Sequence, residues 1–132
     1  MKYSNEDKQF IATEIQRLLS LEKIEPSNSP WRAQVVVAKD LNGHRKKRLC
    51  IDYSQTVNKY TYLDAYPLPH INDFVNKISQ YHVFSSIDLK SAYHQIPLKS
   101  SDKPFTAFEA DGALYQFKRM PFGVTNGVFP LF

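Results

Sequence analysis

The sequence predicts an α+β fold, and three observations lead to that class. Two segments, residues 5–24 and 71–78, carry apolar residues at helical spacing. Two dipeptides, Asn42-Gly43 and Asp111-Gly112, are favoured tight-turn pairs and lie between short runs of β-branched or aromatic residues. Helices, a hairpin and further mixed strands therefore follow one another in one short chain, which is typical of α+β proteins.

Residues 5–24 predict the first helix, with one apolar face. The side chains of that face fall at positions i, i+4, i+7 and i+8, namely Ile11, Ile15, Leu18 and Leu19. Ser4 followed by Asp7 resembles a capping arrangement, and an acidic first turn suits the helix dipole. Pro26 and Pro30 then predict the end of the helix and an extended connection, because proline disfavours helical geometry at and before its own position.

Residues 35–38 and 48–53 predict a hairpin around Asn42-Gly43. Valines dominate the first strand, and the second contains Leu49, Cys50 and Ile51. Basic residues flank the turn: Lys39, His44, Arg45, Lys46, Lys47 and Arg48. Such a cluster is either a solvated turn or a binding site for a phosphate backbone, and the residues alone leave both interpretations open.

Residues 71–78 predict a second helix, which follows Pro67 and Pro69. Residues 82–88 predict a strand that ends at Asp88, and residues 105–108 and 114–117 predict a second hairpin. A carboxylate at a strand end can hold a hard cation such as Mg²⁺. It can equally cap the next turn, and one carboxylate does not make a metal site.

The composition excludes several classes of protein. A formal net charge of +4 is compatible with a phosphate-rich partner without requiring one. The single cysteine, Cys50, permits no internal disulfide and no cysteine-based zinc site. The four histidines lack ligand spacing, and the four glycines form no phosphate-binding loop. No signal peptide or membrane span is visible, so we expect an intracellular protein.

Five blocks in order resemble the reverse transcriptase of gypsy-type LTR retrotransposons. They are Ile24–Trp31, Arg48–Tyr53, Tyr66–Ile71, Phe84–Ile96 and Phe117–Gly123. The resemblance implies a partial right-hand polymerase. Residues 1–64 would form the N-terminal helix, the connection and the fingers hairpin, and residues 65–132 the remaining fingers and the start of the palm. The implied reaction is templated addition of deoxynucleotides to a primer 3′-hydroxyl with Mg²⁺ or Mn²⁺.

The resemblance also implies roles for single residues. Asp88 matches the first metal-binding carboxylate of the family, with the backbone carbonyl of Leu89 beside it. Arg48 matches a fingers arginine that pairs with the nucleotide triphosphate, and Tyr93 matches the aromatic beneath the incoming sugar. The loop containing Phe122 and Gly123 matches one that packs against the nucleotide and template base. Lys39 is a further candidate phosphate contact. On the hairpin, the candidate nucleic-acid-binding residues are Arg45, Lys46 and Lys47.

The family's second catalytic block, an aromatic-x-Asp-Asp hairpin, has no counterpart in this sequence, which contains no adjacent aspartates. With one of three metal-binding carboxylates, we expect the chain alone not to polymerise. In the complete enzyme the expected partners are an RNA or DNA template-primer and a deoxynucleotide, located in the cytoplasm or in virus-like particles. Two alternatives stay open: a non-catalytic nucleic-acid-binding remnant, and a pseudogene product that does not fold stably.

Overall fold

The computed structural model describes residues 3–39, 46–64, 67 and 70–127. Its two α-helices are α1 (Asn5–Ser20) and α2 (Ile71–Ile78). Its strands are β1 (Ile24–Pro26), β2 (Ala33–Ala38), β3 (Arg48–Asp52), β4 (Phe108–Ala110) and β5 (Ala113–Phe117). Short 3-10 turns lie at Val57–Tyr60, Ala92–Gln95 and Lys103–Thr106. These elements confirm the predicted α+β class.

The five strands form one sheet in the order β1-β5-β4-β2-β3. The two predicted hairpins are both present, β2 with β3 and β4 with β5. Positive φ angles at Asp111 (50°) and Gly112 (73°) give the second hairpin the backbone twist of a type I′ turn. The Asn42-Gly43 turn lies outside the described residues. A parallel pairing of β2 with β4 joins the two hairpins into one sheet.

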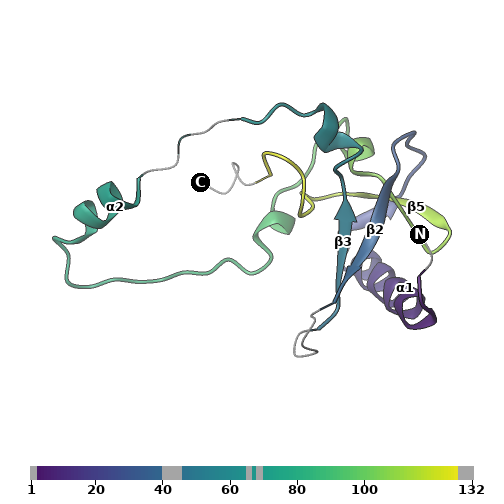
Figure 1. Ribbon diagram of the computed structural model, residues 1–132, viewed down its shortest axis with the longest axis horizontal. Helices are drawn as coiled ribbons and strands as arrows, with labels where there is room; N and C mark the ends of the chain where they lie inside the picture. The colour runs from purple at the N-terminus through teal and green to yellow at the C-terminus, as the bar shows by residue number, and fades with distance from the viewer. Residues whose placement is uncertain (1–2, 40–45, 65–66, 68–69, 128–132) are drawn as a thin grey trace.

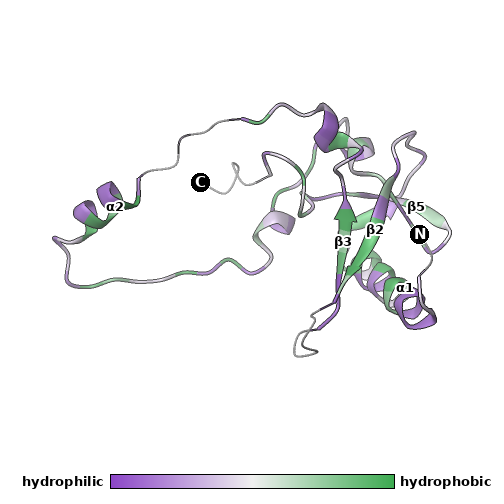
Figure 2. Ribbon diagram, viewed as in Figure 1, coloured by the Kyte–Doolittle hydropathy of each residue, from purple (hydrophilic) through white to green (hydrophobic). Residues whose placement is uncertain are grey.

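Helix α1 covers this sheet with the face that its periodicity predicts. Figure 1 shows α1 lying along one face of the sheet. Its residues Ile11, Ile15 and Leu18 belong to one buried cluster with the sheet residues Val35 and Phe108. Figure 2 shows the matching division of α1 into an apolar side toward the sheet and a polar side away from it. Each buried Ile or Leu contributes about 1.5–3 kcal/mol relative to exposure, so this contact is a main source of stability.

The helix ends at Ser20, earlier than the predicted end near residue 24. Glu22 adopts a left-handed φ of 52°, and two backbone N–H groups turn back to the last carbonyls. Lys23 donates to Leu18 over 3.0 Å and Glu22 to Leu19 over 2.9 Å. These bonds form a Schellman-type end, with glutamate at the position that glycine usually occupies. The chain thereby reverses early enough for Ile24 to begin β1 opposite Phe117.

Residues 82–88 do not form the strand that the sequence predicts. They run extended and exposed, with Val83 88% and Ile87 86% accessible to solvent. A strand needs a neighbour to receive its backbone hydrogen bonds, and none of the described residues pairs with this segment. Helix α2 forms where predicted but buries none of its residues. Both elements lie in a long excursion that leaves the sheet after β3 and returns before β4 (Figure 1).

Candidate nucleotide and nucleic-acid site

Asp88 and Leu89 lie on the exposed part of this excursion. The segment ends at Ser91, whose left-handed φ of 52° turns the chain into the Ala92–Gln95 turn. Within the described ranges, no group of three or more carboxylate, histidine or cysteine side chains could hold a metal ion. Reverse transcriptases use divalent ions, but Asp88 and the Leu89 carbonyl are too few ligands to fit a two-metal site.

Tyr93 and Phe122, two predicted nucleotide-binding residues, are in contact with each other. Their rings meet edge to face with centroids 5.4 Å apart, a favourable aromatic geometry. Tyr93 is half-buried, whereas Phe122 is 68% exposed beside the fully buried Pro121. The structure therefore brings together two sequence-distant candidates and leaves one aromatic face open to solvent.

The Phe122-Gly123 loop is held against the end of β3. Gly123 has a left-handed φ of 93°, and a side chain there would meet the Ile51 carbonyl oxygen at 3.6 Å. Asn58 anchors the loop from the other side: its Nδ2 donates to the Gly123 carbonyl over 2.7 Å, and its Oδ1 accepts from the Thr125 amide over 2.8 Å. Sequence reasoning missed Asn58, because no local pattern marks a side chain that bonds to residues so distant in the chain.

Arg48 occupies the first position of β3, opposite Ala38 at the end of β2. Its side chain is exposed, so the guanidinium is accessible at the stem of the hairpin. Lys46 is exposed as well, while Arg45 lies outside the described residues. Arg48 and the Tyr93–Phe122 pair belong to opposite ends of β3, since Phe122-Gly123 lies near Ile51.

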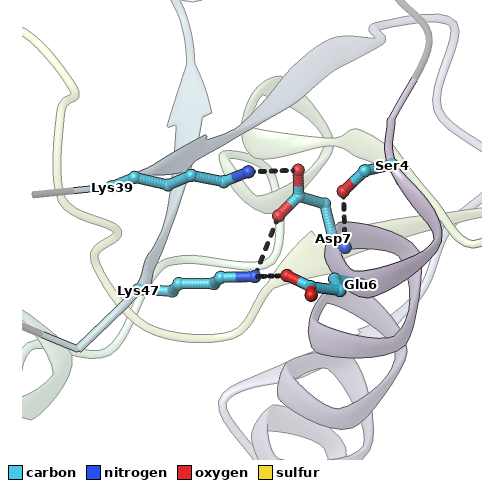
Figure 3. A network of polar contacts seen from close by, with 5 residues as sticks. All are labelled: Ser4, Glu6, Asp7, Lys39 and Lys47. Carbon is cyan, nitrogen blue, oxygen red and sulfur yellow. Dashed lines mark hydrogen bonds and ion pairs between the residues drawn. The ribbon is translucent and has the colours of Figure 1, made fainter. Parts of the chain in front are cut away.

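Two other hairpin lysines are held by the first turn of α1 (Figure 3). The Asp7 carboxylate lies 2.7 Å from the Lys39 ammonium and 3.2 Å from that of Lys47. Glu6 reaches Lys47 as well, over 3.2 Å. The Ser4 hydroxyl accepts from the Asp7 amide over 3.2 Å, which confirms Ser4 as the N-cap. We call Glu6, Asp7, Lys39 and Lys47 the helix–hairpin clamp.

The clamp has a clear electrostatic signature. Hydrogen bonding from Lys39, and then from Ser4 and Lys47, lowers the pKa of Asp7 from 3.8 to about 2. The carboxylates of Glu6 and Asp7 raise the pKa of Lys47 in turn. Lys39, a predicted phosphate contact, thus forms an ion pair with Asp7 of its own chain. The sequence showed the acidic first turn, but not that the hairpin stem would return to it.

His94 lies in a small cavity of about 110 Å³ between α1, β3 and the Ala92–Gln95 turn. Its ring stacks on Phe117 at 6.0 Å with an interplanar angle of 9°. Its Nδ1 atom is buried and has no hydrogen-bond partner among the described residues. Burial is the main cause that lowers the pKa of His94. By these contacts, His94 packs between α1 and the sheet.

Comparison with known proteins now assigns the chain to a family. Residues 26–130 match the sequence model described as "Reverse transcriptase (RNA-dependent DNA polymerase)". The chain belongs to the reverse transcriptase family. It is 39% identical over 121 residues to the retrovirus-related Pol polyprotein from transposon gypsy of Drosophila melanogaster. It is also 36% identical over 126 residues to the enzymatic polyprotein of cauliflower mosaic virus strain NY8153.

The family resemblance deduced from the five sequence blocks is therefore confirmed. The alignments cover 89% and 94% of this chain but only 12% and 18% of those two relatives. The fold is that of retroviral reverse transcriptases as well. A foamy viral protease-reverse transcriptase in complex with double-stranded DNA matches with a TM-score of 0.76 at 23% identity, covering 98% of this chain and 27% of that one. Among the residues that the structure describes, no helix has the length and apolar character needed to cross a membrane.

Proposed function

We propose that this chain is the N-terminal part of the polymerase domain of a retrotransposon Pol polyprotein. Residues 1–64 would supply most of the fingers, and residues 65–132 the remaining fingers and the start of the palm. The observation that carries the proposal is the family match over residues 26–130, together with Pol polyproteins as relatives. The complete protein would copy a template into DNA within the cell, in the cytoplasm or in virus-like particles.

The chain would contribute the contacts to the incoming nucleotide. Arg48 would pair with the triphosphate, because a guanidinium fork matches phosphate geometry. Tyr93 would lie under the sugar, and Phe122 and Gly123 would line the nucleotide and template base. Two features support this assignment: Tyr93 already contacts Phe122, and Gly123 is held by Asn58. Lys39 would contact a phosphate only after its ion pair with Asp7 is broken.

The chain alone would not catalyse nucleotide addition. Asp88 and the Leu89 carbonyl would be its share of a site for Mg²⁺ or Mn²⁺, and further carboxylates would have to come from outside these residues. A two-metal mechanism needs ligands for both ions in fixed positions. We therefore expect no primer extension by the isolated 132-residue chain.

A chimera tests the proposal directly. The segment of the gypsy polyprotein that aligns with this chain is replaced by it, and primer extension is measured on an RNA template with Mg²⁺. We expect an active chimera that Asp88→Asn inactivates. Asp73→Asn, a matched change at another exposed aspartate, should leave activity intact. An active Asp88→Asn chimera would remove Asp88 from the catalytic role.

A second candidate function is nucleic-acid binding without catalysis. The net charge of +4 and the basic residues of the hairpin favour it. The measurement is the affinity of the isolated chain for a primer–template duplex as a function of salt. Contacts with phosphates predict an affinity that falls steeply as salt rises. No binding at low salt would exclude this candidate.

A further inference from the structure

We propose that a basic surface beside the β1–β5 edge of the sheet binds the phosphate backbone of nucleic acid. Its five cations are Arg17, Lys23, Lys90, Lys118 and Arg119, and we call it the β1–β5 basic surface. None of these residues belongs to the β2–β3 hairpin. The inference deepens the proposed nucleic-acid function and rests on it.

Backbone pairing brings the central members of this surface together. The β1–β5 ladder aligns Ile24 with Phe117, and just beyond it the Lys118 amide donates to the Lys23 carbonyl over 2.8 Å. Arg119 is fixed next to them, because its Nη1 donates to the Gln95 carbonyl over 3.3 Å. Lys118 and Arg119 also line a hollow of about 290 Å³. The residues that flank two neighbouring strands thus place three cations close together, and two of them line a shallow depression.

The positive charges of this surface are poorly neutralised. Within the described ranges, no ion pair includes Lys23, Lys90, Lys118 or Arg119. Three carboxylates lie nearby: Glu14 pairs with Arg17 at 2.8 Å, Glu22 lines the hollow, and Glu25 pairs with Lys103 at 3.2 Å. The charge of Lys118 also helps to lower the pKa of Glu25, so Lys118 is partly compensated without forming an ion pair. Burial lowers the pKa of Lys23, and the charges of Arg17, Arg119 and Lys90 lower it further.

Burial is the main cause that lowers the pKa of His94, and the nearby charges of Lys23 and Arg17 lower it further. Clustered like charges cost stability, and a polyanion would relieve that cost on binding.

A nucleic-acid backbone fits this arrangement better than an acidic peptide does. The cations come from the end of α1, the residue before β1, the segment after Asp88 and the residues after β5. They are therefore spread over an area that suits a ligand with repeated charges. Duplex DNA carries about one negative charge per 1.7 Å of its axis. Two of the five cations are arginines, whose planar forks match phosphate oxygens.

The test is binding of the whole chain to double-stranded DNA of about 20 base pairs, followed by fluorescence anisotropy over a range of salt concentrations. The variant carries Lys23→Gln, Lys118→Gln and Arg119→Gln. We expect affinity to fall roughly ten-fold, and the slope of log K against log salt to shrink by up to about 0.9 for each cation–phosphate pair that the variant removes. The variant relieves repulsion but loses the exposed hydrogen bond from Arg119 to the Gln95 carbonyl, so its thermal midpoint should stay close to that of the parent chain.

Two matched triple variants complete the experiment. Lys8→Gln, Lys59→Gln and Lys77→Gln remove the same charge from exposed positions elsewhere and should bind nearly as the parent does. Lys23→Arg, Lys118→Arg and Arg119→Lys keep the charge and should keep the affinity.

As long as the parent chain binds DNA, the outcomes separate this inference from the binding function. Equal loss in the two charge-removing variants would overturn the β1–β5 basic surface, since net charge alone would explain binding. The same holds if polyglutamate competes as well as DNA does. If the parent binds DNA and the β1–β5 variant binds equally well, only this inference fails. If the parent binds no DNA at low salt, both this inference and the binding function fail.

Discussion

Tyr53 links the end of β3 to the turn that precedes β4, and removing its hydroxyl group tests how the sheet is held together. The side chain is 1% exposed, and its hydroxyl donates to the Thr106 carbonyl over 3.0 Å. Tyr53→Phe keeps the ring in the core and deletes only this donor. The Thr106 carbonyl then stays buried without that partner.

The cost follows from leaving a buried acceptor unpaired. Such a group costs about 1–3 kcal/mol, because its hydrogen bond to water is lost on folding and nothing replaces it. For a domain of this size, ~2 kcal/mol corresponds to a decrease in thermal midpoint of roughly 5–10 °C. The same substitution at Tyr60, which is exposed, should shift the midpoint by less than about 1 °C.

The assay is thermal unfolding followed by circular dichroism, repeated at alkaline pH. Burial raises the pKa of Tyr53 above its ordinary value of 10.0, so the folded state keeps the phenol neutral. Unfolding releases a phenol that ionises above pH 10, and the parent chain should therefore lose stability there. Tyr53→Phe should lack this part of the alkaline loss. A midpoint within about 1 °C of the parent at neutral pH would refute the reasoning.

Three further predictions concern the clamp, the exposed excursion and the second hairpin. Because ion pairing lowers the pKa of Asp7 from 3.8 to about 2, its stabilisation is present above pH 4 and lost as pH falls toward 2. Asp7→Asn should destabilise the chain at neutral pH and match the parent near pH 2, as measured by urea unfolding. Val83→Ser with Ile87→Ser should reduce binding of a hydrophobic dye without lowering the thermal midpoint, since both side chains are already exposed. Gly112→Ala should cost about 1 kcal/mol through its φ of 73°, although the added methyl group meets no atom within 4 Å; an unchanged midpoint would contradict this.

Local patterns predicted those elements whose partners lie nearby in the sequence. The apolar face of α1, its Ser4 cap and both hairpins follow from helical spacing, capping chemistry and Asx-Gly turns. Strand β1 was missed because it is three residues long, contains Pro26 and pairs with the distant β5. The predicted strand at residues 82–88 was wrong for the converse reason. Its apolar residues have strand character, but no described segment pairs with them.

In the candidate site, too, local patterns identified residues, whereas contacts between distant segments were not predicted. The family blocks identified Asp88, Arg48, Tyr93 and Phe122 as candidates, and the structure brings only Tyr93 and Phe122 into contact. Glu6 and Asp7 were visible as an acidic helix start, but their pairing with the hairpin depends on how α1 lies across the sheet. Side-chain anchors such as Asn58 leave no periodic signal at all.

The parallel pairing of β2 with β4 bears on the order in which the chain folds. Each hairpin can form from residues that are close in the sequence. Ala33 can pair with Phe108, however, only after the long excursion between the hairpins has closed into a loop. Loop-closure entropy grows only slowly with length, by about 0.6 kcal/mol per doubling, yet non-local pairing of this kind slows folding. Once formed, the loop is tied at its base, where Asn126 accepts from the Asp64 amide over 2.9 Å and donates to the Tyr62 carbonyl over 2.8 Å. We therefore expect α1 and the two hairpins to form first and the segment that carries Asp88 to be ordered last.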